Sequence, residues 1–317
     1  LQTQWVNNKP DTDDQIHSWL KRHLKPDQQE KENIFTVLWK WHEAFSKSNG
    51  KRNSDYFRTL IYDIQDFAPE LTYSQIDRDW MAKLQDWYLS EKPERPQGRN
   101  TKPQRDYTVW RKFVSIKMLL NHLLEEGLIS DDYKKFKAVR ARPAEKIILS
   151  YEQIIQLCTT PIQLEETESQ EELIQQQHAQ RIKLFLFFTS QRYSDYAKLK
   201  KKELVYINEK PYWKFHIQKT DKPHLIPLFG FYAPAYQVLQ YYDFELPKMS
   251  NVMLNRRLKI VGRKVGLTEE VTNTYYRQNK RYTEKKPLYM HIKTHQGRQA
   301  CSTYLAQQGV PIAHIKE

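Results

Sequence analysis

Cysteine is scarce in this chain, which has only Cys158 and Cys301 among its 317 residues. Two cysteines cannot cross-link a small extracellular domain, and neither lies in a cluster of histidines with metal-ligand spacing. The sequence therefore predicts no bound metal. We expect both thiols to be buried as small apolar side chains in a reducing cytoplasm.

Long apolar runs are also lacking. The longest, Leu184 to Phe188, is far shorter than the roughly 20 residues that a membrane-spanning helix needs. The first residues, Leu1 to Trp5, contain no apolar segment of the kind found in signal peptides. These two features predict a soluble intracellular protein with no membrane partner.

Glycine and proline are few, at 8 and 15 residues, and the stretches between them are long and amphipathic. This pattern favours a mainly α-helical protein. Hydrophobic residues make up 39% of the chain, which is enough to form cores. The length favours two domains over one.

Positive charge is abundant, with a formal net charge of +13 and a sequence pI of about 9.4. A surplus of this size favours binding to a polyanion, because binding releases condensed counterions. Ribosomal proteins and membrane-surface proteins are basic as well, so the charge alone leaves the class of partner open.

Residues 31–130 are predicted to form a helical body of four or five helices. Apolar residues recur at helical spacing from Ile34 to Phe45, and Ser54 is a plausible N-cap of the next helix. A later stripe, from Trp110 to Leu124, ends before Gly127, which suits a left-handed C-cap. We expect the aromatic side chains of these stripes to lie in the core.

Two basic, irregular segments follow different parts of this body. Glu91 to Gln104 is rich in proline and is predicted to be a loop that could touch phosphates. Residues 131–149 combine several lysines and arginines with few apolar side chains, and we interpret them as a linker. A basic linker between two bodies would suit a clamp closed around a duplex.

The second body, residues 150–317, begins with Ser150 and Gln153, the pattern of a capping box. The acidic, glutamine-rich stretch Glu165–Gln180 is interpreted as a solvated helix face or loop, and the apolar run Ile182–Thr189 fits either a helix or a strand. The other predicted elements are strands at Tyr212–Ile217 and His224–Leu228, and helices at 234–242, 250–265 and 294–308.

Two short segments of the second body carry residues suited to phosphate chemistry, and a third carries Lys219. Arg192 precedes Ser194, a plausible helix N-cap, where backbone N–H groups favour anions. Asp195 could hold that guanidinium in place. His295 and Arg298 are three residues apart and so share one face of a helix. Two arginines and a histidine around one phosphate would stabilise a pentacovalent transition state.

Together with Lys219, at the turn between the two predicted strands, these segments resemble the arginine, lysine and His-x-x-Arg boxes of the tyrosine recombinase, or phage integrase, family. Phe244–Lys248 and Asn255–Leu258 resemble the mid-domain pattern of integrases from Bacteroides-type mobile elements. The resemblance implies a helical core-binding (SAM-like) domain followed by an α/β catalytic domain with a small β-sheet. Residues 1–30 would then be an N-terminal extension and a candidate remnant of an arm-binding region.

The resemblance also implies a role for each matching residue. Arg192 and Arg298 would clamp the scissile phosphate, and Lys219 would protonate the departing 5′-oxygen. His295 would assist proton transfer at the nucleophile, and Asp195 would support the first arginine. A tyrosine would attack to form a 3′-phosphotyrosyl link without a metal or nucleotide cofactor.

The nucleophilic tyrosine of the family follows the region of Gly309. We expect it beyond Glu317, which makes the catalytic domain C-terminally incomplete and this chain inactive in cleavage. Neither Tyr304, in the middle of the predicted last helix, nor His314 is assigned a catalytic role.

The sequence thus predicts a site-specific DNA integrase of a bacterial mobile element, acting in the nucleoid. Its partners would be double-stranded DNA carrying a specific recombination site and further copies of itself, as a tetrameric synapse. Three alternatives remain open: a non-catalytic DNA-binding relative, a topoisomerase that shares the catalytic domain, and a basic RNA- or ribosome-associated protein.

Overall fold

The computed structural model describes residues 32–48, 51–91, 101–216 and 223–316. Residues 1–30, most of the predicted loop Glu91–Gln104, and Lys219 lie outside the described residues. The chain divides into two compact units. Unit 1 comprises Leu1–Ala144 and Thr274–Thr283, and unit 2 comprises Glu145–Asn273 and Glu284–Glu317.

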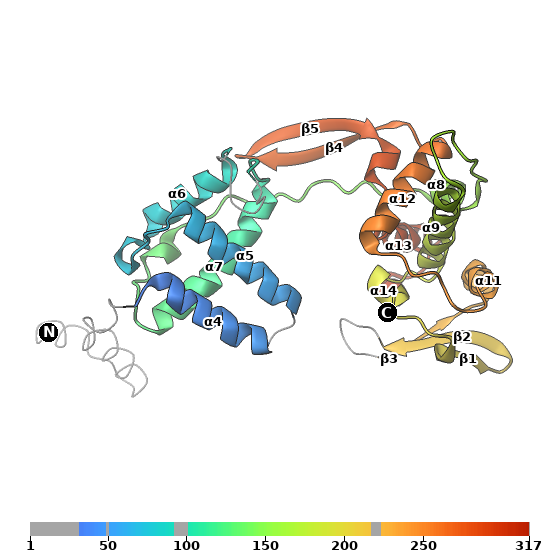
Figure 1. Ribbon diagram of the computed structural model, residues 1–317, viewed down its shortest axis with the longest axis horizontal. Coiled ribbons are helices and arrows are strands. Elements are labelled where there is room, and N and C mark those ends of the chain that lie inside the picture. Colours follow the sequence, from blue (N-terminus) through green and yellow to red (C-terminus); the bar gives the residue numbers. More distant parts are fainter. Residues whose placement is uncertain (1–31, 49–50, 92–100, 217–222, 317) are drawn as a thin grey trace, which may run out of the picture. The chain divides into compact units, whose positions relative to one another are not determined.

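Unit 1 is built on helices (Figure 1). They are amphipathic and bury their apolar faces against one another. Its core includes Leu38, Leu60 and Leu84, none of them more than 1% exposed. The elements are α4 (Ile34–Ser48), α5 (Lys51–Phe67), the 3₁₀ turn η1 (Tyr73–Gln75), α6 (Arg78–Leu89), α7 (Asp106–Glu125) and the 3₁₀ turn η3 (Asp132–Lys135).

Two predictions within unit 1 were wrong in detail. Ser54 is not an N-cap: α5 begins at Lys51, and the buried Ser54 hydroxyl instead lies 2.9 Å from a ring nitrogen of His42. In α7 the buried stripe runs through neighbouring residues such as Val109 and Phe113, while Trp110 is exposed. The sequence fits both stripes, and only the packing of the other helices selects one. Gly127, with φ of 72°, has the predicted left-handed conformation, one residue after the C-cap Glu126.

Residues 131–149 differ from a plain linker. Tyr133, Phe136 and Val139 are buried in the core of unit 1, and Lys117 donates a hydrogen bond to the carbonyl of Phe136 at 3.0 Å. The division between the units falls later, between Ala144 and Glu145.

A β-hairpin that the sequence did not reveal is formed by β4 (Glu270–Arg277) and β5 (Lys280–Pro287). Its turn residues, Gln278 and Asn279, both have positive φ, as a two-residue turn between twisted strands requires. The tip belongs to unit 1, where the amide of Asn279 donates to a carboxylate oxygen of Asp106 at 2.9 Å.

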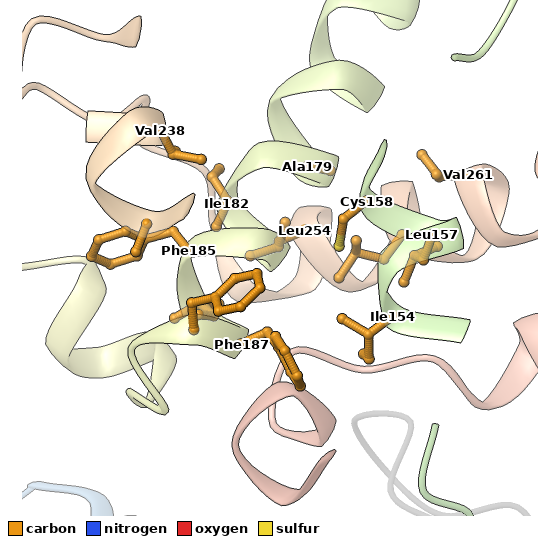
Figure 2. Packing of buried hydrophobic residues seen from close by; sticks show 14 of the residues in the cluster. Ile154, Leu157, Cys158, Ala179, Ile182, Phe185, Phe187, Val238, Leu254 and Val261 are labelled. Atoms are coloured by element: carbon orange, nitrogen blue, oxygen red, sulfur yellow. The ribbon is translucent and has the colours of Figure 1, made fainter. Parts of the chain in front are cut away.

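Unit 2 is organised around α9 (Gln170–Phe188), which packs against α8, α11, α12 and α13. Figure 2 shows side chains such as Leu157, Phe185 and Leu254 meeting in its core. The predicted capping box of Ser150 and Gln153 is confirmed, because each side chain bonds the backbone of the other residue. The other helices are α8 (Tyr151–Thr159), α10 (Tyr193–Tyr196), α11 (Ala233–Tyr241), α12 (Asn251–Lys264), α13 (Gln296–Gln307) and α14 (Ile312–Lys316), with 3₁₀ turns η4 (Lys201–Glu203), η5 (Gly230–Tyr232) and η6 (Leu288–His291).

A three-stranded antiparallel sheet also belongs to unit 2. Its order is β1 (Leu204–Ile207), β2 (Lys210–His216) and β3 (Pro223–Pro227). The two predicted strands are confirmed as β2 and β3, and β1 was missed. Trp213, 1% exposed and paired with Ile226, anchors the sheet on α9, where its ring lies 5.5 Å from that of Phe185.

The acidic stretch 165–180 is not simply a solvated surface. Its helical part belongs to α9, and its glutamates pair with basic side chains of α12. The three pairs are Glu165 with Arg263 at 2.6 Å, Glu168 with Lys264, and Glu172 with Arg257 at 3.2 Å. No helix in the described part of the chain is long and apolar enough to cross a bilayer.

The pair between Glu168 and Lys264 should contribute to stability, since its side chains are only 11% and 5% exposed. Glu168→Gln leaves the ammonium without its counter-charge and should lower the free energy of unfolding by about 3 kcal/mol. Asp243→Asn is the matched control, because its pair with Lys201 is exposed and should contribute less than about 1 kcal/mol. Urea unfolding followed by circular dichroism measures both values.

The contribution of the Glu168–Lys264 pair to stability depends on pH. Burial alone would raise the pKa of Glu168, but hydrogen bonds from Lys264 and Gln176 outweigh it and lower the pKa below its ordinary value. The contribution of the pair is therefore present above the ordinary carboxyl pKa and is lost as the pH falls. The stability difference between wild type and Glu168→Gln should shrink in acid, and a constant difference would contradict this account.

Candidate phosphate-binding site

Arg192 lies where α9 ends and the chain reverses. Ser190 follows the C-cap of α9 with φ of 53°, a left-handed conformation that turns the backbone away from the helix axis. Arg192 is itself at the N-cap position of the four-residue helix α10, so the predicted cap at Ser194 was wrong. Asp195, in the same helix, is buried with 3% of its surface exposed.

His295 and Arg298 lie at the start of α13. His295 is at the N-cap position and is exposed, whereas Arg298 is half-buried in the first turn. A guanidinium N–H of Arg298 donates to the carbonyl of Ser190 at 3.2 Å. This bond joins the two arginine-bearing segments, which are more than a hundred residues apart in the sequence.

The positive charges of the site act on one another. Desolvation by the surrounding protein lowers the pKa of His295, and the charges of Arg298 and Arg192 lower it further. Burial and Arg192 also lower the pKa of Arg298, while Asp195 opposes that shift. A guanidinium stays protonated at neutral pH, so the site holds two cations beside an imidazole that favours its neutral form. A neutral imidazole can accept a proton, and the two guanidinium groups can bind a phosphate.

A cavity of about 310 Å³ opens beside this group. It is lined by Ser190, His224, Arg298 and Cys301, among others. His224, at the start of β3, was not identified as a site residue from the sequence. Burial and the charge of Arg298 lower its pKa, whereas Asp195 raises it. A histidine a few residues after Lys219, in the same predicted hairpin, was the signal that could have identified it.

The remaining sequence candidates have different surroundings. Tyr304 is stacked between Tyr151 and Phe231, with ring centroids 4.3 and 5.9 Å away, so it packs as a structural residue. Both cysteines are buried and free, as predicted. Burial raises the pKa of Cys158 to about 12 and that of Cys301 to about 11, so neither is a ready thiolate. Among the described residues, no group of three or more His, Cys, Asp or Glu side chains is placed to hold a metal ion.

The mutual effect of these charges can be measured without any reaction. Replacing Arg298 with Met removes a positive charge near His295 and should raise the pKa of its imidazole, as followed by NMR titration of the ring protons. Arg263→Met is the control, since Arg263 pairs with Glu165, is not among the charges that lower the pKa of His295, and should leave the His295 titration unchanged. An unshifted His295 in the Arg298 variant would show that the two side chains do not share a site.

A family model, the phage integrase SAM-like domain, matches residues 33–138. No curated protein sequence matches the chain.

Solved structures match nearly the whole chain at low sequence identity. A lambda integrase (75–356) dimer bound to a COC′ core site is 12% identical, with a TM-score of 0.61, covering 86% of this chain and 89% of that one. The Tn1549 transposon integrase (82–397) in complex with circular intermediate DNA is 13% identical, with a TM-score of 0.60, covering 90% and 91%. The XerH site-specific recombinase bound to palindromic difH substrate is 12% identical, with a TM-score of 0.55, covering 96% and 86%.

These matches confirm the predicted fold class, a mainly α protein with small β-sheets, in which a helical domain is followed by an α/β domain. Residues 33–138 thus match the phage integrase SAM-like domain, and the chain as a whole has the fold of the integrase and recombinase structures that it matches.

Proposed function

We propose that this protein is a site-specific DNA recombinase, an integrase that cleaves and rejoins DNA strands through a 3′-phosphotyrosyl intermediate. Its role would be the integration and excision of a bacterial mobile element, at DNA in the nucleoid. The observation that carries the proposal is the bond from Arg298 to the carbonyl of Ser190, two residues before Arg192. It brings the two arginine boxes to one place, within reach of His295.

Each residue would have one task in the reaction. Arg192 and Arg298 bind the non-bridging oxygens of the scissile phosphate and stabilise the charge that develops there. His295, whose pKa is lowered, accepts the proton of the attacking tyrosine. Asp195 offsets the repulsion between the arginines, and Lys219 protonates the departing 5′-oxygen. The reaction needs no metal, because the two guanidinium groups supply the positive charge.

Double-stranded DNA with a specific recombination site would be the substrate, and the net charge of +13 supports binding to its backbone. Copies of the chain would associate on that DNA into a tetrameric synapse. Support comes from similar folds seen in a lambda integrase dimer on a core site and in a lambda integrase tetramer bound to a Holliday junction.

The arginine roles are tested by Arg192→Ala and Arg298→Ala in the full-length protein. Each change should reduce strand cleavage by about a hundredfold or more, since one donor to the transition-state charge is lost. The affinity for uncleaved DNA should change little. Covalent adduct on a nicked suicide substrate, measured by denaturing gel, gives the rate, and fluorescence anisotropy gives the affinity.

Arg263→Ala serves as the control for loss of a surface cation outside the site and should cleave at the wild-type rate. Cleavage at that rate by either site variant would refute the assignment. No covalent adduct from the full-length wild type on its cognate site would refute the proposed function itself.

The role of Lys219 is tested by changing the leaving group. Lys219→Ala should slow the cleavage of normal DNA because the 5′-oxygen then leaves without a proton. A substrate with a 5′-bridging sulfur needs no general acid and should restore most of the rate. Equal defects on both substrates would remove Lys219 from proton transfer. Lys201→Ala, at an exposed lysine in the same unit, is the control.

A further inference from the structure

Lys183 is a buried charge that the proposed reaction does not use. It lies in the second half of α9 with 0% of its surface exposed. In the described part of the chain it is the only lysine or arginine among the buried residues. Its neighbours along the helix, Ile182 and Phe185, belong to the core of unit 2. Burying an ammonium group is unfavourable unless it gains specific partners, so those partners indicate what the residue does.

The partners of Lys183 are two backbone carbonyls. Its Nζ donates to the carbonyl of Lys293 at 2.7 Å and lies 3.4 Å from that of Thr294. Thr294 immediately precedes His295, so Lys183 is hydrogen-bonded to the turn that leads into α13. An apolar side chain of similar length would fill the same space but leave both carbonyls without this donor.

Other side chains hold the same turn from α12. The amide of Thr294 donates to Asn255 Oδ1 at 2.8 Å, and its hydroxyl donates to Asn251 Oδ1 at 2.9 Å. The turn is therefore fixed from two sides, by α9 and α12. The start of α13 also packs on α9 at Gly297, where an added Cβ would lie at van der Waals distance, 3.5 Å, from the nitrogen of Phe187.

We infer that Lys183 is a positioning residue, which holds the turn before α13 so that His295 and Arg298 face the phosphate held by Arg192. This inference rests on the proposed function for its catalytic consequence, but its structural part does not. Lys183 does not touch the substrate; it acts through the carbonyls of Lys293 and Thr294.

Besides its hydrogen bonds, Lys183 carries a charge that acts on His295. Burial lowers its pKa to about 8, and the nearby Cys158 opposes the shift. The neutral amine keeps two N–H groups, so both carbonyls can be bonded in either protonation state. The protonated form also contributes to the lowered pKa of His295. Substitution removes both the bonds and the charge, whereas a rise in pH removes only the charge.

The test compares Lys183→Met with Lys264→Met. Both remove a lysine that is almost inaccessible, but Lys264 pairs with Glu168 and makes no contact with the turn. In Lys183→Met we expect the pKa of His295 to rise and the amides of Thr294 and Gly297 to exchange faster with solvent. We also expect DNA cleavage to fall by about tenfold to a hundredfold with unchanged DNA affinity, because the catalytic groups are misplaced. Lys264→Met should show none of these changes beyond its general loss of stability.

The outcomes separate the inference from the function on which it rests. Wild-type exchange and titration in Lys183→Met would overturn it, and so would an equal cleavage defect in Lys264→Met at matched stability. If no form of the protein cleaves DNA, the proposed function fails, yet the exchange of the Thr294 and Gly297 amides still decides whether Lys183 holds the turn. Should Lys183→Met not fold, Lys183→Gln retains a shorter donor and should give an intermediate effect on amide exchange and cleavage, while the pKa of His295 rises because the charge is removed.

Discussion

The close crossing of α9 and α13 is the constraint on which the site depends. At Gly297 the two backbones lie within van der Waals reach of each other, and just beyond α9 the carbonyl of Ser190 accepts a hydrogen bond from Arg298. Lys183, two turns earlier on α9, bonds the segment that enters α13. One buried helix thus sets the position of Arg192 at its end and of the His-x-x-Arg turn along its side.

Gathering positive charge at one place opposes folding, and unit 2 limits this cost locally. Asp195, buried beside the arginines, raises the pKa of Arg298 against the effect of Arg192. On α12, three basic side chains are paired with glutamates of the 165–172 segment, which compensates their charge within unit 2. Because each of these pairs is neutral, the net charge of +13 is carried by the other groups of the chain, and the arginines of the site are part of it.

The fold is recognisable in solved structures that share only about one residue in eight with this chain, as the identities of 12% and 13% show. Cores tolerate extensive substitution as long as volume and pattern are kept, so burial pattern rather than identity carries the fold. In unit 2 that pattern centres on α9, whose buried face meets α8, α11 and α12 (Figure 2).

Local signals in the sequence determined much of this protein. Capping at Ser150, the turn at Gly127, the strands β2 and β3 and the spacing of His295 and Arg298 all depend on neighbouring residues, and each was predictable. Tertiary structure decided what depends on distant partners. It selected the buried stripe of α7, paired the acidic stretch with α12, and gave a lysine within an apolar run two carbonyls to bind. Such choices are made by contacts between residues far apart in the sequence, 85 residues for Glu172 and Arg257 and 111 for Lys183 and Thr294, and no local pattern encodes them.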